Sequence, residues 1–256
     1  MHRILSWAGT VFFLPTFGAI LAVFDVAQRI ARLFGQRPQE YVAGALQAAL
    51  VAAFRLCDTR LLVERAPGFV SGASYIVISN HQSMFDIAII GALLFWSFPK
   101  YVSKRELGRG IPSVSYNLRR GGHVLIDRRD GAGAVAAIRG LGERARGGGL
   151  SPVIFPEGTR ARAGMLGEFR RTGTAALLES APDVPVLPLT IDQSWRLLSH
   201  NMLPVPWGVR VRVRLGEPIA RRPGDTDDML SHVREEMEAT LARWRGDASP
   251  TVRRAV

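Results

Sequence analysis

The apolar positions of the chain follow three patterns, and each predicts a different kind of element. Residues 75–78 and 184–191 are short, mostly apolar runs of the kind found in strands inside a sheet. Residues 209–215 alternate between apolar side chains and Arg, which predicts a strand with one buried face. Residues 135–146 and 227–244 carry apolar side chains at helical spacing. Weaker patterns of the same kinds predict strands at 60–65, 101–103, 123–126 and 152–155, and helices at 85–94 and 174–180.

Strands separated by helical patterns predict an α/β fold with a layered, mixed, largely parallel sheet flanked by helices. The amino-terminal part differs, because residues 4–24 contain no charged side chain and would form a helix of about 31 Å, the thickness of a hydrocarbon core. Pro15 would kink that helix. The second apolar run, at 42–54, is rich in Ala and too short to span.

Three interpretations of these two runs stay open: a spanning first helix, a two-helix hairpin in one leaflet, and a buried pair of helices in a soluble protein. A signal peptide fits poorly, because the run is long and no A-x-A cleavage site follows it. Arg29, Arg32 and Arg37 follow the first run, and such a charge bias favours a cytoplasmic location for the remainder.

Composition narrows the class of partner. The 256-residue chain has a net charge of +11, and its basic residues are almost all Arg, with Lys only at Lys100 and Lys104. That balance suits anionic partners such as phosphates, nucleic acid or an anionic membrane surface, although a GC-rich genome also replaces Lys with Arg. The Arg face of residues 209–215 has no interleaved aromatic side chains, which argues against nucleic acid. A single Cys, Cys57, excludes an internal disulfide.

His81 and Asp86 are the first candidates for chemistry. His81 is expected at the turn between the strand at 75–78 and the helix at 85–94. Five helical steps rotate through about 500°, so the two side chains meet only if His81 lies outside the helix and folds back over it. A carboxylate held against one imidazole nitrogen fixes the tautomer and leaves the other nitrogen as a general base. A buried structural His is the alternative, and no His/Cys cluster accompanies the pair to suggest a metal site.

A second candidate loop has the sequence FPEGTR, at residues 155–160. Glu157 is able to accept a hydrogen bond from a hydroxyl, Gly158 lets backbone N–H groups approach a ligand, and Arg160 is able to hold a phosphate with two hydrogen bonds. A Glu–Arg pair that stabilises a turn is the alternative. Lys104, in the sequence SKREL, is a further candidate for phosphate binding, or else part of a solvated basic turn.

The sequence N-H-x-x-x-x-D at 80–86, followed by SKREL at 103–107, FPEGTR at 155–160 and VPVLPL at 184–189, resembles the glycerolipid acyltransferases, specifically the 1-acyl-glycerol-3-phosphate (lysophosphatidate) acyltransferase family. The resemblance spans roughly residues 58–215. It implies that His81 is the catalytic base, oriented by Asp86. It implies no metal and no cofactor, and it places the following residues at the substrate: Lys104, Arg105, Arg128, Glu157, Gly158, Thr159 and Arg160.

The resemblance also implies an activity and a domain organisation. The expected reaction moves a fatty acyl group from acyl-CoA or acyl carrier protein to the free hydroxyl of 1-acyl-glycerol-3-phosphate, giving phosphatidate. The expected location is the cytoplasmic face of the inner membrane, with membrane lipids as partners and no nucleic acid. The expected parts are a membrane-associated helical hairpin at 1–57, the acyltransferase domain at 58–246 and a flexible tail at 247–256.

Three other functions remain open from the sequence. Another lysolipid, such as a lyso-ornithine lipid, is an alternative acceptor. A lysophospholipid hydrolase would use His81 to activate water in place of a lipid hydroxyl. A protein that binds anionic lipid without catalysis would need no base, and the presence of His81, Asp86 and Glu157 argues against it.

Overall fold

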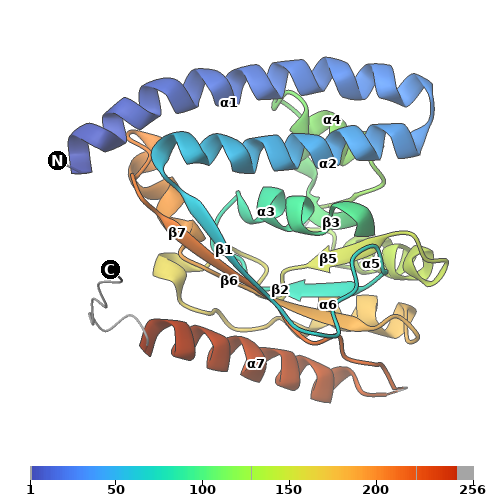
Figure 1. Cartoon of the computed structure of the whole chain (residues 1–256). Coiled ribbons are helices and arrows are strands. Elements are labelled where there is room, and N and C mark those ends of the chain that lie inside the picture. The colour runs from blue at the N-terminus through green and yellow to red at the C-terminus, as the bar shows by residue number, and fades with distance from the viewer. Residues whose placement is uncertain (1, 128, 223, 247–256) are drawn as a thin grey trace.

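A seven-stranded sheet forms the centre of the protein in the computed structural model, which describes residues 2–127, 129–222 and 224–246 (Figure 1). The strand order is β1-β7-β6-β2-β5-β3-β4. All neighbouring strands run parallel except β6 and β7, so the predicted mixed, largely parallel sheet is confirmed. The strands are β1 (Arg60–Arg65), β2 (Ile76–Ser79), β3 (Pro99–Lys104), β4 (Val124–Ile126), β5 (Ser151–Ile154), β6 (Val186–Asp192) and β7 (Arg210–Leu215).

Helices cover both faces of the sheet (Figure 1). The α-helices are α1 (His2–Leu33), α2 (Gln36–Ala53), α3 (Asp86–Leu93), α4 (Val114–Arg120), α5 (Gly131–Arg146), α6 (Arg171–Ser180) and α7 (Thr226–Gly246). Short 3-10 helices join them: η1 (Phe54–Cys57), η2 (Phe95–Ser97), η3 (Arg105–Gly108), η4 (Arg162–Gly164) and η5 (Ser194–Met202).

Two apolar cores lie on opposite faces of the sheet because side chains alternate along each strand. On β2, Val77 packs into one core, beneath α1, η1 and α3. Its neighbours Ile76 and Ile78 pack into the other core with α5, α6 and α7. All four side chains of β2 are buried, as the continuous apolar run predicted for a strand inside the sheet.

The amino-terminal helices are longer than their apolar runs predicted. α1 continues past Pro15 and Asp25 to Leu33, and α2 with η1 covers Gln36–Cys57. Both are therefore long and apolar enough to cross a membrane, which corrects the expectation that the second is too short. They differ in burial, because 11% of the apolar window of α1 and 50% of that of α2 are buried inside the protein.

The first two helices and the sheet share one core. Phe13 of α1, together with Phe54 and Cys57 of η1, belongs to the same apolar cluster as the strands β2, β5, β6 and β7. The boundary expected at residue 57 thus runs through a continuous packed region. The flexible tail expected at 247–256 lies outside the described residues.

Candidate active site

The candidate residues reach one edge of the sheet from distant parts of the sequence. Strands β2, β3, β5 and β6 run in the same direction, so their carboxyl ends lie along the same edge. Open α/β sheets bind ligands beyond the carboxyl ends of their strands. This edge receives His81 after β2, Lys104 at the end of β3, Glu157 after β5 and Asp192 at the end of β6.

His81 and Asp86 form the pair that the sequence predicted. Nδ1 of His81 lies 2.9 Å from Oδ2 of Asp86, and His81 lies outside α3, of which Asp86 is the first residue. The turn is tight because the backbone N–H groups of Gln82 and Ser83 also donate to Oδ2, at 2.6 and 2.7 Å. A carboxylate only accepts hydrogen bonds, so Nδ1 of His81 carries the proton and Nε2 is left as the basic nitrogen.

Exposure differs sharply within the pair. The side chain of Asp86 is fully buried, whereas that of His81 is 17% exposed. The imidazole stacks on the ring of Phe155, with 4.1 Å between centroids and an interplanar angle of 19°. The base is thus held by a buried carboxylate and an aromatic ring, and it keeps limited access to solvent.

The FPEGTR loop is hydrogen-bonded to the backbone of His81. Oε1 of Glu157 accepts from the His81 N–H at 2.7 Å, and the N–H of Ala161 donates to the His81 carbonyl at 2.6 Å. Oε2 of Glu157 accepts from the N–H of Gly167 at 2.7 Å. The structure therefore brings the two motifs together, although 76 positions separate His81 from Glu157.

Glu157 is 3% exposed, and both of its carboxylate oxygens accept backbone N–H groups. Burial raises the pKa of its carboxyl, against the two hydrogen bonds that lower it. These contacts favour a role for Glu157 in holding the loop in place, rather than the expected contact with a substrate hydroxyl. Gly158 has a φ of +67°, which L side chains rarely adopt, so the turn itself requires glycine.

The cationic candidates differ in placement. Arg160 and Thr159 are exposed, and the hydrogen bond from the next residue, Ala161, keeps this part of the loop beside His81. Lys104 and Arg105 are exposed at the end of β3, two strands from β2. No hydrogen bond or ion pair joins Lys104 or Arg105 to His81 within the described part of the chain. Arg128 lies outside the described residues.

One contact of the site was not predicted from the sequence. The hydroxyl of Ser194 donates to Oδ1 of Asp86 at 2.6 Å, and both side chains are fully buried. Ser194 follows β6, whose apolar run was predicted as a strand. The signal available in the sequence was the end of this apolar run. A strand parallel to β2 places the residues that follow it at the same edge of the sheet as His81.

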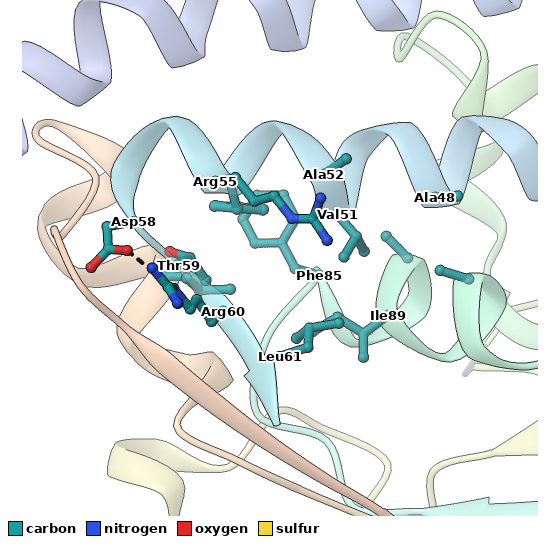
Figure 2. Close-up of a pocket in the computed structure, with 14 residues that line it drawn as sticks. Ala48, Val51, Ala52, Arg55, Asp58, Thr59, Arg60, Leu61, Phe85 and Ile89 are labelled. Carbon is teal, nitrogen blue, oxygen red and sulfur yellow. Dashed lines mark hydrogen bonds and ion pairs between the residues drawn. The ribbon is translucent and has the colours of Figure 1, made fainter. Parts of the chain in front are cut away.

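A largely apolar cavity of about 600 Å³ lies between α2, α3, η1 and β1 (Figure 2). Its walls include Val51, Leu61, Phe85 and Ile89, and the guanidinium of Arg55 lies between Val51 and Phe85. Phe85 directly precedes Asp86, so one part of the cavity adjoins the loop that carries the catalytic candidates. Its volume falls in the range of ligand pockets, roughly 300–1,000 Å³.

No group of three or more His, Cys, Asp or Glu side chains that could hold a metal ion occurs among residues 2–127, 129–222 and 224–246. The site as described consists of an imidazole, buried carboxylates and exposed cations. Such a set is able to move a proton and to bind an anionic group.

Comparisons with known proteins identify what the chain is similar to. A family model described as Acyltransferase matches residues 61–192. The chain is 36% identical to a 1-acyl-sn-glycerol-3-phosphate acyltransferase of Helicobacter pylori, over 41% of this chain and 43% of that protein. It is 30% identical to a lyso-ornithine lipid O-acyltransferase of Pseudomonas aeruginosa, over 70% of this chain and 59% of that protein.

The chain spans about half the length of several curated relatives that it matches. A solved structure, that of the 1-acyl-sn-glycerophosphate acyltransferase PlsC of Thermotoga maritima, covers 96% of this chain and 98% of its own, with a TM-score of 0.77 and 21% sequence identity. At that identity the likeness supports the fold, including the two amino-terminal helices.

Proposed function

Because the chain belongs to the acyltransferase family, whose model matches residues 61–192, we propose that it transfers a fatty acyl group to lysophosphatidate and forms phosphatidate. The acyl donor is a thioester, either acyl-CoA or acyl carrier protein. The acceptor is the free hydroxyl of 1-acyl-glycerol-3-phosphate. Relatives that carry the name 1-acyl-sn-glycerol-3-phosphate acyltransferase support this acceptor.

The single observation that carries the proposal is the hydrogen bond of 2.9 Å between Nδ1 of His81 and Oδ2 of Asp86. In the proposed reaction Nε2 of His81 removes the proton of the acceptor hydroxyl while its oxygen attacks the thioester carbonyl. Asp86 stabilises the imidazolium that forms. Collapse of the tetrahedral intermediate breaks the C–S bond, and the proton on His81 passes to the departing thiolate. No covalent acyl-enzyme is required.

Arg160 and Lys104 are proposed to anchor the phosphate of the acceptor. Both are exposed and lie at the carboxyl edge of the sheet that also carries His81. A guanidinium presents two N–H groups in the geometry of a phosphate, and Lys adds a point charge. Holding the phosphate keeps the neighbouring hydroxyl near the base, which is worth several kcal/mol of the barrier for well-oriented reactants.

The apolar cavity beside α3 supports a lipid substrate. It measures about 600 Å³, and most of its lining side chains are apolar. Phe85 lines it next to Asp86, so we propose that a fatty chain lies there with its polar end toward the pair. A water-soluble acceptor would not require an apolar cavity.

Membrane association is proposed through the two amino-terminal apolar helices. Near its start, α1 accepts hydrogen bonds from the main domain, at Ser6 from Trp207 N–H and at Thr10 from Val205 N–H. Near its end, Gln28 donates to Ser113. A helix held by the same domain at both ends does not cross to the opposite side, which favours a hairpin embedded in one leaflet. The positive charges of Arg29, Arg32 and Arg37 after the apolar run favour the cytoplasmic face.

A lyso-ornithine lipid is the second candidate acceptor, because the chain is 30% identical to a lyso-ornithine lipid O-acyltransferase over 70% of its own length. The experiment that tests both offers the purified full-length protein labelled acyl-CoA or labelled acyl carrier protein with lysophosphatidate, with lyso-ornithine lipid, or with no acceptor. We expect labelled phosphatidate from wild type and none from His81→Ala. Labelled fatty acid released without acceptor would instead indicate a thioester hydrolase, and unlabelled fatty acid released from the lysolipid would indicate a lysophospholipid hydrolase. Lipid binding without either reaction would indicate a non-catalytic binder.

A further inference from the structure

The carboxylate of Asp86 accepts four hydrogen bonds, and their distribution is uneven. Oδ2 accepts from Nδ1 of His81 and from the N–H groups of Gln82 and Ser83, all within its own loop. Oδ1 accepts from the hydroxyl of Ser194 at 2.6 Å, across 108 positions of sequence. We propose that Ser194 is a positioning residue for acyl transfer, whose hydroxyl fixes the carboxylate of Asp86 so that Oδ2 faces His81; this inference rests on the proposed function.

The need for this hydroxyl follows from the burial of Asp86. Its side chain is fully buried, so water does not replace a lost partner at Oδ1. A buried charged oxygen without a partner is costly, and the carboxylate would relieve the cost by rotating about its Cβ–Cγ bond. Rotation would carry Oδ1 toward the N–H donors of Gln82 and Ser83 and draw Oδ2 away from the imidazole.

The segment that carries Ser194 is itself held in place from two sides. Asn80 exchanges two hydrogen bonds with the backbone of Ile191, at 2.7 and 2.8 Å. The carboxylate of Asp192 accepts a hydrogen bond of 2.9 Å from the guanidinium of Arg245, a residue of α7. The hydrogen bonds with Asn80 fix the end of β6 relative to the loop of the catalytic candidates, and the contact with Arg245 fixes it relative to α7.

The backbone turns at Gln193, which has a φ of +68°. A residue other than glycine is uncommon in this left-handed region, and such conformations persist where the surroundings enforce them. The turn takes the chain out of β6 and into η5, so that the hydroxyl of Ser194 reaches Asp86. The turn at Gln193 supports a positioning role for Ser194, and the hydrogen bond from Ser194 to Asp86 is the main observation for it.

The test compares Ser194→Ala with a matched control, Ser151→Ala. Ser151 is also fully buried and accepts one hydrogen bond, from the N–H of Tyr75 at 3.0 Å, but it lies at the opposite, amino ends of the strands. For Ser194→Ala we expect kcat to fall about 10- to 100-fold, the usual effect of one hydrogen bond to a charged group. The KM values for acceptor and thioester stay unchanged, and Ser151→Ala keeps the wild-type kcat.

Two further measurements separate positioning from general destabilisation. In an Asp86→Asn background the Ser194→Ala substitution should have no additional effect on kcat, because both act through the same carboxylate. Ser194→Cys keeps a donor at this position, although a weaker one on a slightly larger atom, and should give an intermediate kcat. Equal losses of kcat in the two backgrounds, or the same loss in Ser151→Ala, would overturn the proposal.

A readout that needs no turnover is the proton resonance of His81 Nδ1–H, measured by NMR. We expect it to shift in Ser194→Ala and to stay in place in Ser151→Ala, and an unmoved resonance in Ser194→Ala contradicts the inference. If the wild-type protein acylates no lysolipid, the proposed function is wrong. If the wild type is active and Ser194→Ala is equally active, only the role of Ser194 is wrong.

Discussion

Arg160 and Glu157 belong to one loop but have opposite environments. Glu157 is buried and accepts two backbone N–H groups, whereas Arg160 is exposed and makes no ion pair with any residue that the structure describes. A buried carboxylate of this kind shapes the loop, and an exposed guanidinium beside a base is available to a ligand. The division of roles within the hexapeptide follows from burial.

At this scale we predict that Arg160→Ala raises the KM for lysophosphatidate by roughly 10- to 100-fold, since hydrogen bonds to charged groups contribute about 1.5–3 kcal/mol. The KM for the thioester should stay within about twofold. Arg222→Ala removes another exposed Arg, on the loop before α7, and serves as the matched control. Steady-state kinetics with each substrate varied in turn checks this. An unchanged acceptor KM would contradict the assignment of Arg160 to the phosphate.

The residue scale also shows how far sequence reasoning reaches into the site. The spacing of His81 and Asp86 already required a histidine outside the helix and folded back over it, and the 2.9 Å contact confirms that geometry. Ser194 was not predicted because a hydroxyl has no motif of its own. Its partner depends on which strand lies beside β2, and the order of strands in a sheet is a property of packing rather than of local sequence.

Among the elements, α2 is attached to the sheet through a polar contact. Nζ of Lys100 on β3 lies 2.6 Å from Oε1 of Glu40 on α2, and both side chains are nearly buried. Burial lowers the pKa of Lys100, while Glu40 counters this. Next to them Nδ1 of His123 accepts the N–H of Tyr101 at 3.0 Å, which requires a neutral ring. Lys100 and Arg144 lie near His123, and their positive charges disfavour a further positive charge on its ring.

His123 should therefore make the protein sensitive to acid. Burial, followed by the charges of Lys100 and Arg144, lowers the pKa of His123 to about 3. In the unfolded chain the pKa of histidine is about 6.5, so that state binds the proton first as pH falls. Stability contributed by neutral His123 is fully present above about pH 6.5 and is lost progressively toward pH 3.

We predict that His123→Gln, which keeps an acceptor oxygen, flattens the dependence of unfolding free energy on pH between about 6.5 and 4. Denaturant titrations at a series of pH values measure it. His232→Gln, on the exposed surface of α7, removes a histidine elsewhere and should leave the wild-type slope. A slope in His123→Gln as steep as that of wild type would show that other groups cause the acid sensitivity.

Element boundaries were predictable where the apolar side chains of a strand pack against the core on one face. The strand expected at 60–65 is β1, and the alternation at 209–215 is β7 with one residue fewer. α4 was missed because it has only seven residues and lacks a longer apolar repeat. α1 runs beyond its apolar stretch because polar side chains near its end bind the segment at Ser113, a contact that no local pattern reveals.

For the molecule as a whole, the outer surface of α1 is the conspicuous feature. It exposes large apolar side chains along most of its length, at Ile4, Trp7, Val11, Phe12, Leu14, Val23, Val26, Ile30 and Leu33. Removing this helix to test its function would also remove Phe13 from the core, because Phe13 is fully buried. Substitutions on its surface are therefore the cleaner experiment.

We predict that replacing Phe12 and Val23, which are 67% and 64% exposed, by Ser weakens binding to anionic lipid vesicles while the protein stays folded. The matched control replaces Leu62 and Val70, exposed at 46% and 59% and located outside α1. Sedimentation with vesicles, accompanied by circular dichroism, measures both. Equal loss of binding in the two double variants would mean that α1 has no special part in membrane attachment.

The hydrogen bonds of His81 N–H to Glu157 and of Ala161 N–H to the His81 carbonyl have a consequence for recombining this protein with its relatives. Segment 80–86 contributes only backbone atoms of residue 81 to these two hydrogen bonds, whereas segment 155–170 contributes the carboxylate of Glu157 and the N–H of residue 161. A foreign 155–170 segment therefore keeps both hydrogen bonds as long as it carries a carboxylate at position 157. Exchange of such a segment alone should leave the His81 turn intact, and a segment without that carboxylate should disturb it.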